Sequence, residues 1–302
     1  MAQTQPNGPF KFAHFSDPHL PIPAGIDTKI LTLKQRLGWM KWHRSRTHSH
    51  DPAKIEACLH DLAVQGVRHL CITGDLVHLG TPPEIEAAAR WLDSLRQRGF
   101  ICHLVPGNHD AMTAAAKRAA LSAWYPTDSH AFAPHPAFPY CHDAGPVSFI
   151  GLDTARALPV GLACGYLDAS QLDRFEHLLA AAKRAGRFRV VLLHHPPVRS
   201  VESLRRRLYG AHHFRRILAR QGAELVLHGH VRQALRTTLP GPDGPVPVFG
   251  ATSISETSPD AANASPFTIF TLDTTCEPAA PSLKSISHTV GSVCKLCRQS
   301  PR

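Results

Sequence analysis

The first third of the chain contains three short apolar runs, each followed by a polar turn, and two segments with helical periodicity separate them. The apolar runs cover residues 11–16, 69–73 and 101–105, and the helical segments cover 52–65 and 82–98. Asp51 before Pro52 is typical of a helix start, and Thr81 with Glu84 forms a capping box at the second start. Strands that alternate with helices in this way usually pair in parallel, with their carboxyl ends at one edge of a sheet. The sequence therefore predicts an α/β fold with its polar turns gathered at one rim.

The rest of the chain continues this pattern and then changes. Strands are predicted at 147–152, 189–193, 224–227, 234–239, 246–251 and 267–272, and helices at 168–185 and 212–221. The last three strands indicate an antiparallel finish, because short turns join them. Residues 126–146, rich in Pro, His and Asp, are predicted to form a long loop. We predict one domain over residues 11–275, and a disordered tail over 276–302 because that segment is rich in Pro, Ser and Lys.

Five of the predicted turns carry side chains of the kinds that bind metal ions. They are Asp17 and His19, Gly74 and Asp75, Gly107 to Asp110, His194 and His195, and His228 to His230. Imidazole nitrogens mixed with carboxylate and amide oxygens suit Mn, Fe, Zn or Co better than Mg or Ca. A carboxylate such as Asp75 could bridge two ions about 3.5–4 Å apart, because its two oxygens offset the repulsion between the ions. Water between two such ions would become hydroxide near neutral pH and could attack phosphorus.

Taken together and in this order, the five turns resemble the calcineurin-like metallophosphoesterases over about residues 11–252. The resemblance implies a four-layer α-β-β-α sandwich of two mixed β-sheets flanked by helices, with a dinuclear metal centre at the strand ends. By this resemblance one ion is held by Asp17, His19 and Asp75, and the other by Asp75, Asn108, His194 and His230. His109 matches the histidine beside the phosphate and could donate a proton to the leaving oxygen, with Asp110 fixing its tautomer. The predicted catalytic residues are therefore Asp75, His109 and Asp110.

One turn departs from the family pattern. The family commonly ends with Gly-His-x-His, whose last histidine completes the first metal site, but this chain has Gly229-His230-Val231-Arg232. Arginine is permanently charged and does not normally bind metals, so the first site is expected to be weak or empty. Two interpretations of Arg232 stay open. Its guanidinium group could bind the substrate phosphate, or the site could be degraded and slow.

The segment 20–50 interrupts the regular order of strands and helices with a basic insertion. Leu33, Leu37, Met40 and Trp42 form an imperfect apolar stripe among cations. One interpretation is a solvated basic helix that packs on the domain by this stripe. The other is an element over residues 24–50 that covers an anionic substrate or touches acidic lipid. The net charge of +10 favours an anionic partner in either case.

Other features bear on location and thiol chemistry. The N-terminal residues lack a basic start with an apolar core, and no run approaches the ~20 apolar residues that span a bilayer. We therefore expect a cytoplasmic protein, with peripheral contact to the inner membrane surface as an option. Cys294 and Cys297 have chelating spacing but no second pair, so free thiols are expected. The run Arg205–Arg207 is interpreted as a solvated face that could also recruit substrate.

These features predict a metal-dependent phosphoesterase that hydrolyses a phosphodiester or a pyrophosphate through a metal-activated hydroxide. Two alternatives remain within the same fold. One is a nuclease, although the sequence contains no recognisable nucleic-acid module. The other is a pyrophosphatase acting on a nucleotide-linked lipid, which the basic insertion with its Trp residues would suit. A third alternative, from another class, is a metal-binding scaffold without turnover, suggested by Arg232.

Overall fold

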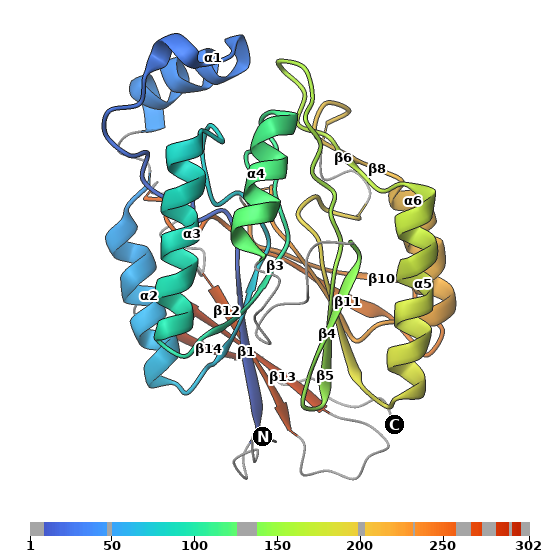
Figure 1. Ribbon diagram of the computed structural model, residues 1–302. Helices are drawn as coiled ribbons and strands as arrows, with labels where there is room; N and C mark the ends of the chain where they lie inside the picture. Colours follow the sequence, from blue (N-terminus) through green and yellow to red (C-terminus); the bar gives the residue numbers. More distant parts are fainter. Residues whose placement is uncertain are drawn as a thin grey trace.

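The computed structural model describes residues 9–46, 50–125, 138–198, 203–231, 233–257, 267–273, 282–289 and 292–296. Two six-stranded sheets lie face to face in this part of the chain, and helices cover their outer faces (Figure 1). The predicted arrangement of two mixed β-sheets flanked by helices is confirmed.

The first sheet has the strand order β14-β13-β12-β1-β2-β3. Its parallel half contains β1 (Phe10–Phe15), β2 (His69–Ile72) and β3 (Ile101–Leu104), and its antiparallel half contains β12 (Phe267–Asp273), β13 (Ser282–Thr289) and β14 (Ser292–Leu296). The helices α2 (Pro52–Val64) and α3 (Pro82–Gln97) follow the turns after β1 and β2 and lie on the outer face of this sheet (Figure 1). The strands β1, β2 and β3 and the helices α2 and α3 are those that the alternating pattern of the first third predicts.

The second sheet has the strand order β10-β11-β9-β7-β5-β4. Its strands are β4 (Tyr140–Ala144), β5 (Val147–Gly151), β7 (Phe188–Leu192), β9 (Leu225–His228), β10 (Leu235–Leu239) and β11 (Val246–Gly250). The four central strands are parallel, and β4 and β10 are antiparallel edges. The helices α5 (Ala169–Arg184) and α6 (Ala211–Gln221) cover the outer face of this sheet, where Phe175 stacks on Phe214. Two short strands, β6 (Gly165–Tyr166) and β8 (Leu208–Tyr209), pair beside it.

Apolar side chains fill the space between the two sheets. Phe12 of β1 meets Phe149 of β5 edge to face, with ring centroids 5.4 Å apart, and both side chains are fully buried. The same core continues under α2 and α3 through residues such as Leu59 and Leu92. Because this core fixes the position of one sheet against the other, the carboxyl ends of five strands lie at one end of the molecule. These strands are β1, β2, β3, β7 and β9.

Three parts of the fold differ from the sequence-based prediction. The predicted loop 126–146 contains the edge strand β4, which pairs with β5. The helix α4 (Ala114–Trp124) was not predicted; it begins at Thr113, whose side chain accepts the amide of Ala116. The segment 276–302, predicted to be disordered, contains β13 and β14, because the edge of β12 offers backbone partners that composition does not reveal. The domain boundary at residue 275 stays a prediction.

The insertion over residues 20–50 begins irregularly and then forms helical structure. It contains the 3₁₀ turn η1 (Thr28–Ile30), the helix α1 (Leu33–Lys41) and the π-helical turn η2 (Trp42–Arg46). Thr32 and Gln35 form a capping box at the start of α1. Among the described residues, no helix is long and apolar enough to cross a membrane.

Three histidines connect the two sheets away from the carboxyl ends of the strands. His69 Nδ1 lies 3.1 Å from His103 Nε2, and His103 Nδ1 lies 3.3 Å from His142 Nδ1. The ring of His103 also stacks on Phe149 at 3.7 Å. Burial, followed by the proximity of His142, lowers the pKa of His69 to about 4, and burial lowers the pKa of His103 well below its usual value. These rings are therefore neutral in the folded protein at pH 6.

We expect the free energy of unfolding to decrease as the pH falls from about 6.5 towards 4. In this range an unfolded chain protonates His69, with its ordinary pKa of 6.5, whereas the folded protein keeps it neutral. Stability is therefore greatest above pH 6.5, and each such histidine removes up to about 1.4 kcal/mol per pH unit below it. Denaturant unfolding of the His69→Phe variant should show a weaker pH dependence than the wild type. His177→Phe is the control variant, because His177 is exposed on α5. An equal pH dependence of the free energy of unfolding in His69→Phe and His177→Phe would contradict this explanation.

Candidate metal centre

The predicted ligands lie on turns with an unusual backbone conformation. Among the described residues, the non-glycine residues with positive φ are Asp17, His19, Asp75 and His230, at 50°, 41°, 57° and 70°. Backbone of this kind costs of order 1–3 kcal/mol per residue and is concentrated at functional sites. The amide of Asp17 donates to the carbonyl of Gly74, and the amide of His19 donates to the carbonyl of Asp75, at 3.0 and 3.1 Å. The turns after β1 and β2 are thus joined into one unit.

Asp110 holds the next turn against this unit. Its two carboxylate oxygens accept the backbone amides of Asp75, Leu76, Val77 and Gly107, at 2.8–3.2 Å. Burial and then the charge of Asp75 raise the pKa of Asp110 to about 8, while the amides of Gly107 and Val77 lower it. The prediction that Asp110 fixes the tautomer of His109 is wrong, because its oxygens are used by these amides. Asp110 positions the backbone around Asp75 instead.

Two predicted ligands of the first ion approach each other across the turn after β1. His19 Nδ1 lies 3.2 Å from the carbonyl of Val77, so this nitrogen must donate and the neutral ring carries its lone pair on Nε2. His19 Nε2 lies 3.8 Å from Asp17 Oδ1 and 4.0 Å from Asp75 Oδ2. Asp17 Oδ2 accepts the hydroxyl of Ser16 and the amide of His230, which leaves Oδ1 facing His19.

The predicted ligands of the second ion meet in the same way on the other side of Asp75. His194 Nδ1 donates to the carbonyl of Thr73 at 2.6 Å, so its lone pair is on Nε2. That nitrogen lies 3.1 Å from Asn108 Oδ1 and 3.5 Å from Asp75 Oδ2. The side chain of Asp75 thus faces both histidines through one atom. Its other oxygen, Oδ1, accepts the amide of His109 at 2.8 Å.

The donor atoms of this cluster fit metal ions better than they fit one another. Lone pairs on His19 Nε2 and His194 Nε2 face carboxylate and amide oxygens, and such pairs repel unless a cation lies between them. Groups of Asp17, Asp75 and His194, and of His19, Asp75 and His109, have donor atoms within 4.8 Å of one another. The histidines donate their Nδ1 protons to backbone carbonyls, which is the usual way in which metal-binding imidazoles are oriented. Only Oδ2 of Asp75 faces both histidines, so a bridge between two ions would use this one oxygen and not both oxygens as predicted.

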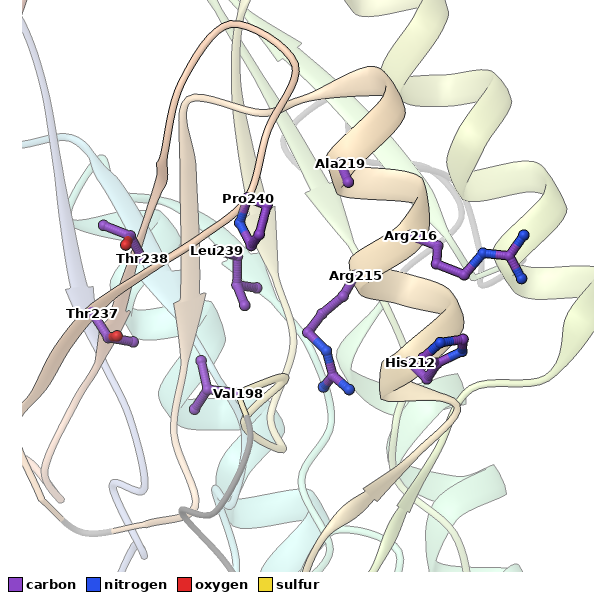
Figure 2. A pocket seen from close by; sticks show the side chains of 9 residues that line it. All are labelled: Val198, His212, Arg215, Arg216, Ala219, Thr237, Thr238, Leu239 and Pro240. Atoms are coloured by element: carbon purple, nitrogen blue, oxygen red, sulfur yellow. The ribbon is translucent and has the colours of Figure 1, made fainter.

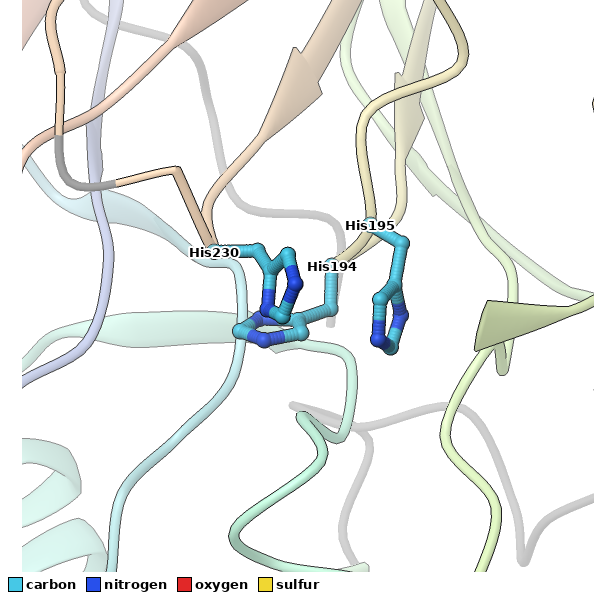
Figure 3. Close-up of side chains that lie close together, drawn as sticks. All are labelled: His194, His195 and His230. Atoms are coloured by element: carbon cyan, nitrogen blue, oxygen red, sulfur yellow. The ribbon is translucent and has the colours of Figure 1, made fainter. Parts of the chain in front are cut away.

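His230 and His195 have different surroundings although both lie beside His194 (Figure 3). The ring of His230 lies 5.1 Å from that of His194, and burial lowers its pKa well below the usual value, so it is neutral and able to bind a metal. The three histidines form a further group with donor atoms within 4.8 Å. However, His195 Nδ1 meets the hydroxyl of Thr154 at 2.8 Å, and its Nε2 donates to the carbonyl of Ala163 at 3.1 Å. His195 is therefore a buried neighbour whose two nitrogens are already used.

His109, the predicted catalytic histidine, lies at the more exposed side of the cluster. Its Nδ1 donates to the carbonyl of His78 at 2.6 Å. Its ring meets that of His19 edge to face, with centroids 5.0 Å apart. The Nε2 atom of a neutral ring would accept a proton, and the doubly protonated ring would donate one to a leaving group. The carbonyl of His78 thus has the orienting role that the sequence argument gave to Asp110.

Gly107 is required by the close approach of two turns. A Cβ atom at this position would overlap with Asp75 Oδ1 and with the amide of Asp75. We expect Gly107→Ala to displace the Asp75 carboxylate and to weaken metal binding by roughly 10–100-fold, the range seen when groups that orient ligands are changed. Titration with Mn or Zn, followed by calorimetry, measures this effect. Gly186→Ala is the control for backbone strain away from the centre, because Gly186 has a φ of 66° but a Cβ atom there meets nothing within 4 Å. Equal metal affinity in the two variants would contradict the geometry described here.

A separate cavity of about 470 Å³ lies between α6 and β10 (Figure 2). It is lined by Val198, His212, Arg215, Arg216, Ala219, Thr237, Thr238, Leu239 and Pro240. None of these residues belongs to the predicted metal centre. This cavity is therefore not part of the proposed metal centre.

A family model described as calcineurin-like phosphoesterase matches residues 10–233. The chain belongs to this family. The match includes every residue proposed here as a metal ligand, and it supports metal-dependent hydrolysis of phosphoesters. A search of curated proteins gave no match.

Solved structures of phosphatases share this fold. A dimetal phosphatase from Danio rerio has a TM-score of 0.59 and 14% identity, with 93% of this chain and 95% of that chain covered. A purple acid phosphatase from yellow lupin (Lupinus luteus) seeds has a TM-score of 0.56 and 13% identity, with 95% of this chain and 53% of that chain covered. The NAD nucleotidase of Haemophilus influenzae has a TM-score of 0.50 and 12% identity, with 96% of this chain and 60% of that chain covered. At these identities the similarity supports the fold alone.

Some features of the site were not predicted from the sequence, and other predicted residues lie outside the described part of the chain. Ser16 and the carbonyls of Thr73, Val77 and His78 orient the ligands, but the sequence gives no signal for carbonyl direction. Arg206, interpreted from the sequence as part of a solvated run, donates to the carbonyl of His230 at 2.9 Å. Arg232 and Cys297 lie outside the residues that the structure describes, so the interpretations of Arg232 and the free thiol expected at Cys297 stay predictions.

Proposed function

We propose that this calcineurin-like phosphoesterase hydrolyses a phosphodiester or a pyrophosphate at the cluster around Asp75. The observation that carries the proposal is the approach of two predicted ligands, His19 and His194, to Asp75 Oδ2. His194 Nε2 lies 3.5 Å from this oxygen and His19 Nε2 lies 4.0 Å from it, and both rings are oriented by backbone carbonyls. Such an arrangement is suited to two cations, one on each side of a shared carboxylate oxygen.

The proposed ligands of the first ion are Asp17, His19 and Asp75, and those of the second are Asp75, Asn108, His194 and His230. When bound, two ions of Mn, Fe, Zn or Co would lower the pKa of water between them and neutralise charge on the phosphoryl oxygens. Asp110 keeps the backbone around Asp75 in place through four amide bonds. His109, oriented by His78, would hydrogen-bond the phosphoryl group or protonate the leaving oxygen.

The basic surroundings of the site suit an anionic phosphate-ester substrate, and the choice of a diester or a pyrophosphate stays a prediction. Arg206 contacts the carbonyl of His230, and Arg205 and Arg207 flank it on the same exposed segment. Cations near the site attract an anionic phosphate-ester substrate with more than one charged or polar group. A nuclease and a nucleotide-linked lipid pyrophosphatase remain alternatives for the same chemistry. A cytoplasmic location also remains a prediction.

Turnover of simple esters with added metals tests the proposed function. The protein should hydrolyse bis(p-nitrophenyl) phosphate faster than p-nitrophenyl phosphate in the presence of at least one of Mn, Co, Fe, Zn or Ni. Asn108→Ala should abolish this activity, because Asn108 Oδ1 lies 3.1 Å from His194 Nε2 in the proposed second site. Absence of turnover with every metal would favour the non-catalytic scaffold. Faster hydrolysis of the monoester would contradict the diester proposal but not the phosphoesterase class.

Arg232 provides a separate test of the first metal site. Since a histidine at this position would add an imidazole ligand, we expect Arg232→His to bind more metal per chain than the wild type. Elemental analysis after dialysis measures the metal content. Arg236→His, at an exposed position on β10, controls for adding a histidine elsewhere. Equal metal content in the wild type and Arg232→His would remove this interpretation of the departure from the family pattern.

A further inference from the structure

The helix α1 turns its apolar stripe away from the protein. Leu33, Leu37 and Met40, spaced as one face of a helix, are 68%, 40% and 45% exposed. The opposite face packs on the domain instead: the side chain of Gln35 is buried and donates to the carbonyl of Leu79 at 3.1 Å. The interpretation of a basic helix that packs on the domain by this stripe is therefore wrong for these three residues, whereas Trp42, the fourth residue of the stripe, is partly buried. An ordinary surface helix would bury these side chains.

A second exposed apolar segment lies beside this stripe. Val160, Leu162 and Leu204 are 50%, 37% and 68% exposed. They are on two loops joined by the bond from the Ala163 amide to the Arg205 carbonyl, at 2.9 Å. Lys34 Nζ of α1 donates to the carbonyl of Leu158 in the first of these loops, also at 2.9 Å.

We call these two segments, residues 28–44 and residues 158–163 with 203–207, the apolar-cationic rim. In the described part of the chain, the large exposed hydrophobic residues lie on this rim with the single exception of Val64. Figure 1 shows α1 at one end of the molecule, outside the two sheets and beyond α3. Exposed apolar side chains gathered in this way mark an interaction surface more often than scattered ones do.

The charge on the rim has one sign. Residues 28–50, 157–163 and 203–207 contain no Asp or Glu. The cations on the described part of the rim are Lys29, Lys34, Arg36, Lys41, Arg44, Arg205, Arg206 and Arg207. Apolar side chains interleaved with Lys and Arg are typical of elements that lie in the headgroup region of a membrane. A second copy of the chain would bring the same cations against these cations, which is unfavourable.

The rim is connected to the loops of the metal centre. A Cβ atom at Gly38 of α1 would meet Leu79 Cδ2 at 2.8 Å, so α1 lies directly on the turn after β2. The ring of Trp42 lies 6.3 Å from that of His78, and His78 stacks on His19 at 4.7 Å. On the other side, Arg206 donates to the carbonyl of His230. Both segments of the rim thus contact the turns that carry the proposed ligands.

We propose that the apolar-cationic rim binds the surface of a bilayer that contains anionic phospholipid. Leu33, Leu37, Met40, Val160, Leu162 and Leu204 enter the headgroup region, and the Lys and Arg side chains contact phosphate groups. The metal centre then faces the membrane surface. The proposal does not depend on turnover, because vesicle binding is measured without substrate.

Vesicle sedimentation of the full chain tests the proposal. The wild type should sediment with vesicles of phosphatidylcholine and phosphatidylglycerol, bind weakly to vesicles of phosphatidylcholine alone, and be released by high salt. The double variant Leu33→Glu/Leu37→Glu should lose binding by roughly tenfold or more, because it removes apolar contact and adds negative charge. Val64→Glu is the control, since Val64 on α2 is also exposed, at 74%, but lies outside the rim. It should bind as the wild type does.

Three outcomes would overturn the proposal: equal binding to both vesicle types, equal binding of the double variant and the wild type, or loss of binding in Val64→Glu as well. Light scattering during gel filtration distinguishes a further outcome. If the wild type is a dimer that the double variant dissociates, the rim is an interface between copies and the membrane proposal fails. Thermal unfolding and hydrolysis of bis(p-nitrophenyl) phosphate should be unchanged in the double variant, which shows that fold and metal centre are intact. If the wild type does not hydrolyse bis(p-nitrophenyl) phosphate, the proposed function is contradicted, but the result of the vesicle experiment still stands.

Discussion

Replacement of Asp75 by Asn should reduce turnover by at least about 10³-fold and lower the metal content, the largest effect we expect from any single substitution. Asn keeps the size of the side chain, and its Oδ1 can still accept the hydrogen bond that the amide of His109 donates to Asp75 Oδ1 in the wild type. The atom that changes is Oδ2, the one that faces His19 and His194. A neutral amide at this point cannot offset the charge of two cations. Assays with bis(p-nitrophenyl) phosphate and elemental analysis of the same sample measure both effects.

Asp173→Asn is the matched control for this experiment. Asp173 is an exposed aspartate on α5, with Oδ2 3.9 Å from His177 Nε2, and lies outside the proposed metal centre. It should retain the activity and metal content of the wild type. Thermal unfolding of both variants separates loss of the site from loss of the fold. If Asp75→Asn keeps full activity and full metal content, Asp75 does not bridge two ions.

Replacement of His109 by Asn should reduce kcat by about 10²–10⁴-fold while leaving the metal content unchanged. His109 is oriented by the carbonyl of His78 at 2.6 Å, and it is not among the proposed metal ligands. If it protonates the leaving oxygen, the loss should be smaller for p-nitrophenyl esters than for alkyl esters, because p-nitrophenolate leaves without a proton. If it only binds the phosphoryl group, the loss should be equal for both substrates.

The exposed His177 on α5 provides a control, as His177→Asn should keep the wild-type rates. The comparison of leaving groups then decides between the two roles of His109. A fall in metal content in His109→Asn would contradict both roles. It would instead make His109 a metal ligand, since its donor atom lies within 4.8 Å of those of His19 and Asp75.

The fold and the position of the site could be predicted because they depend on local patterns. Apolar runs that end at polar turns define the strand ends, and capped helices between them define parallel pairing. This places Asp17, Asp75, Asn108 and His194 at one edge without any knowledge of side-chain contacts. The structure brings these residues together, with Asn108 Oδ1 and Asp75 Oδ2 both next to His194 Nε2.

The features that the sequence did not predict depend on contacts between distant segments. Asp110 accepts the backbone amides of Asp75 to Val77, which are more than thirty residues away in the sequence. Its position next to His109 in the sequence therefore suggested the wrong partner. The outward face of α1 depends on Gln35, which binds the carbonyl of Leu79 and turns Leu33 away from the domain. Helical periodicity locates such a stripe but does not show which side faces the protein.

The most direct test of the central claim is a crystal structure of the Mn-loaded protein with anomalous diffraction measured at a wavelength where Mn scatters strongly. We expect two anomalous peaks, one on each side of Asp75 Oδ2. One should be bound by Asp17 and His19, and the other by Asn108, His194 and His230. Lower occupancy at the first position would agree with Arg232 in place of a histidine. Peaks bound by His195, or by residues away from Asp75, would contradict the proposed assignment of the metal ligands around Asp75.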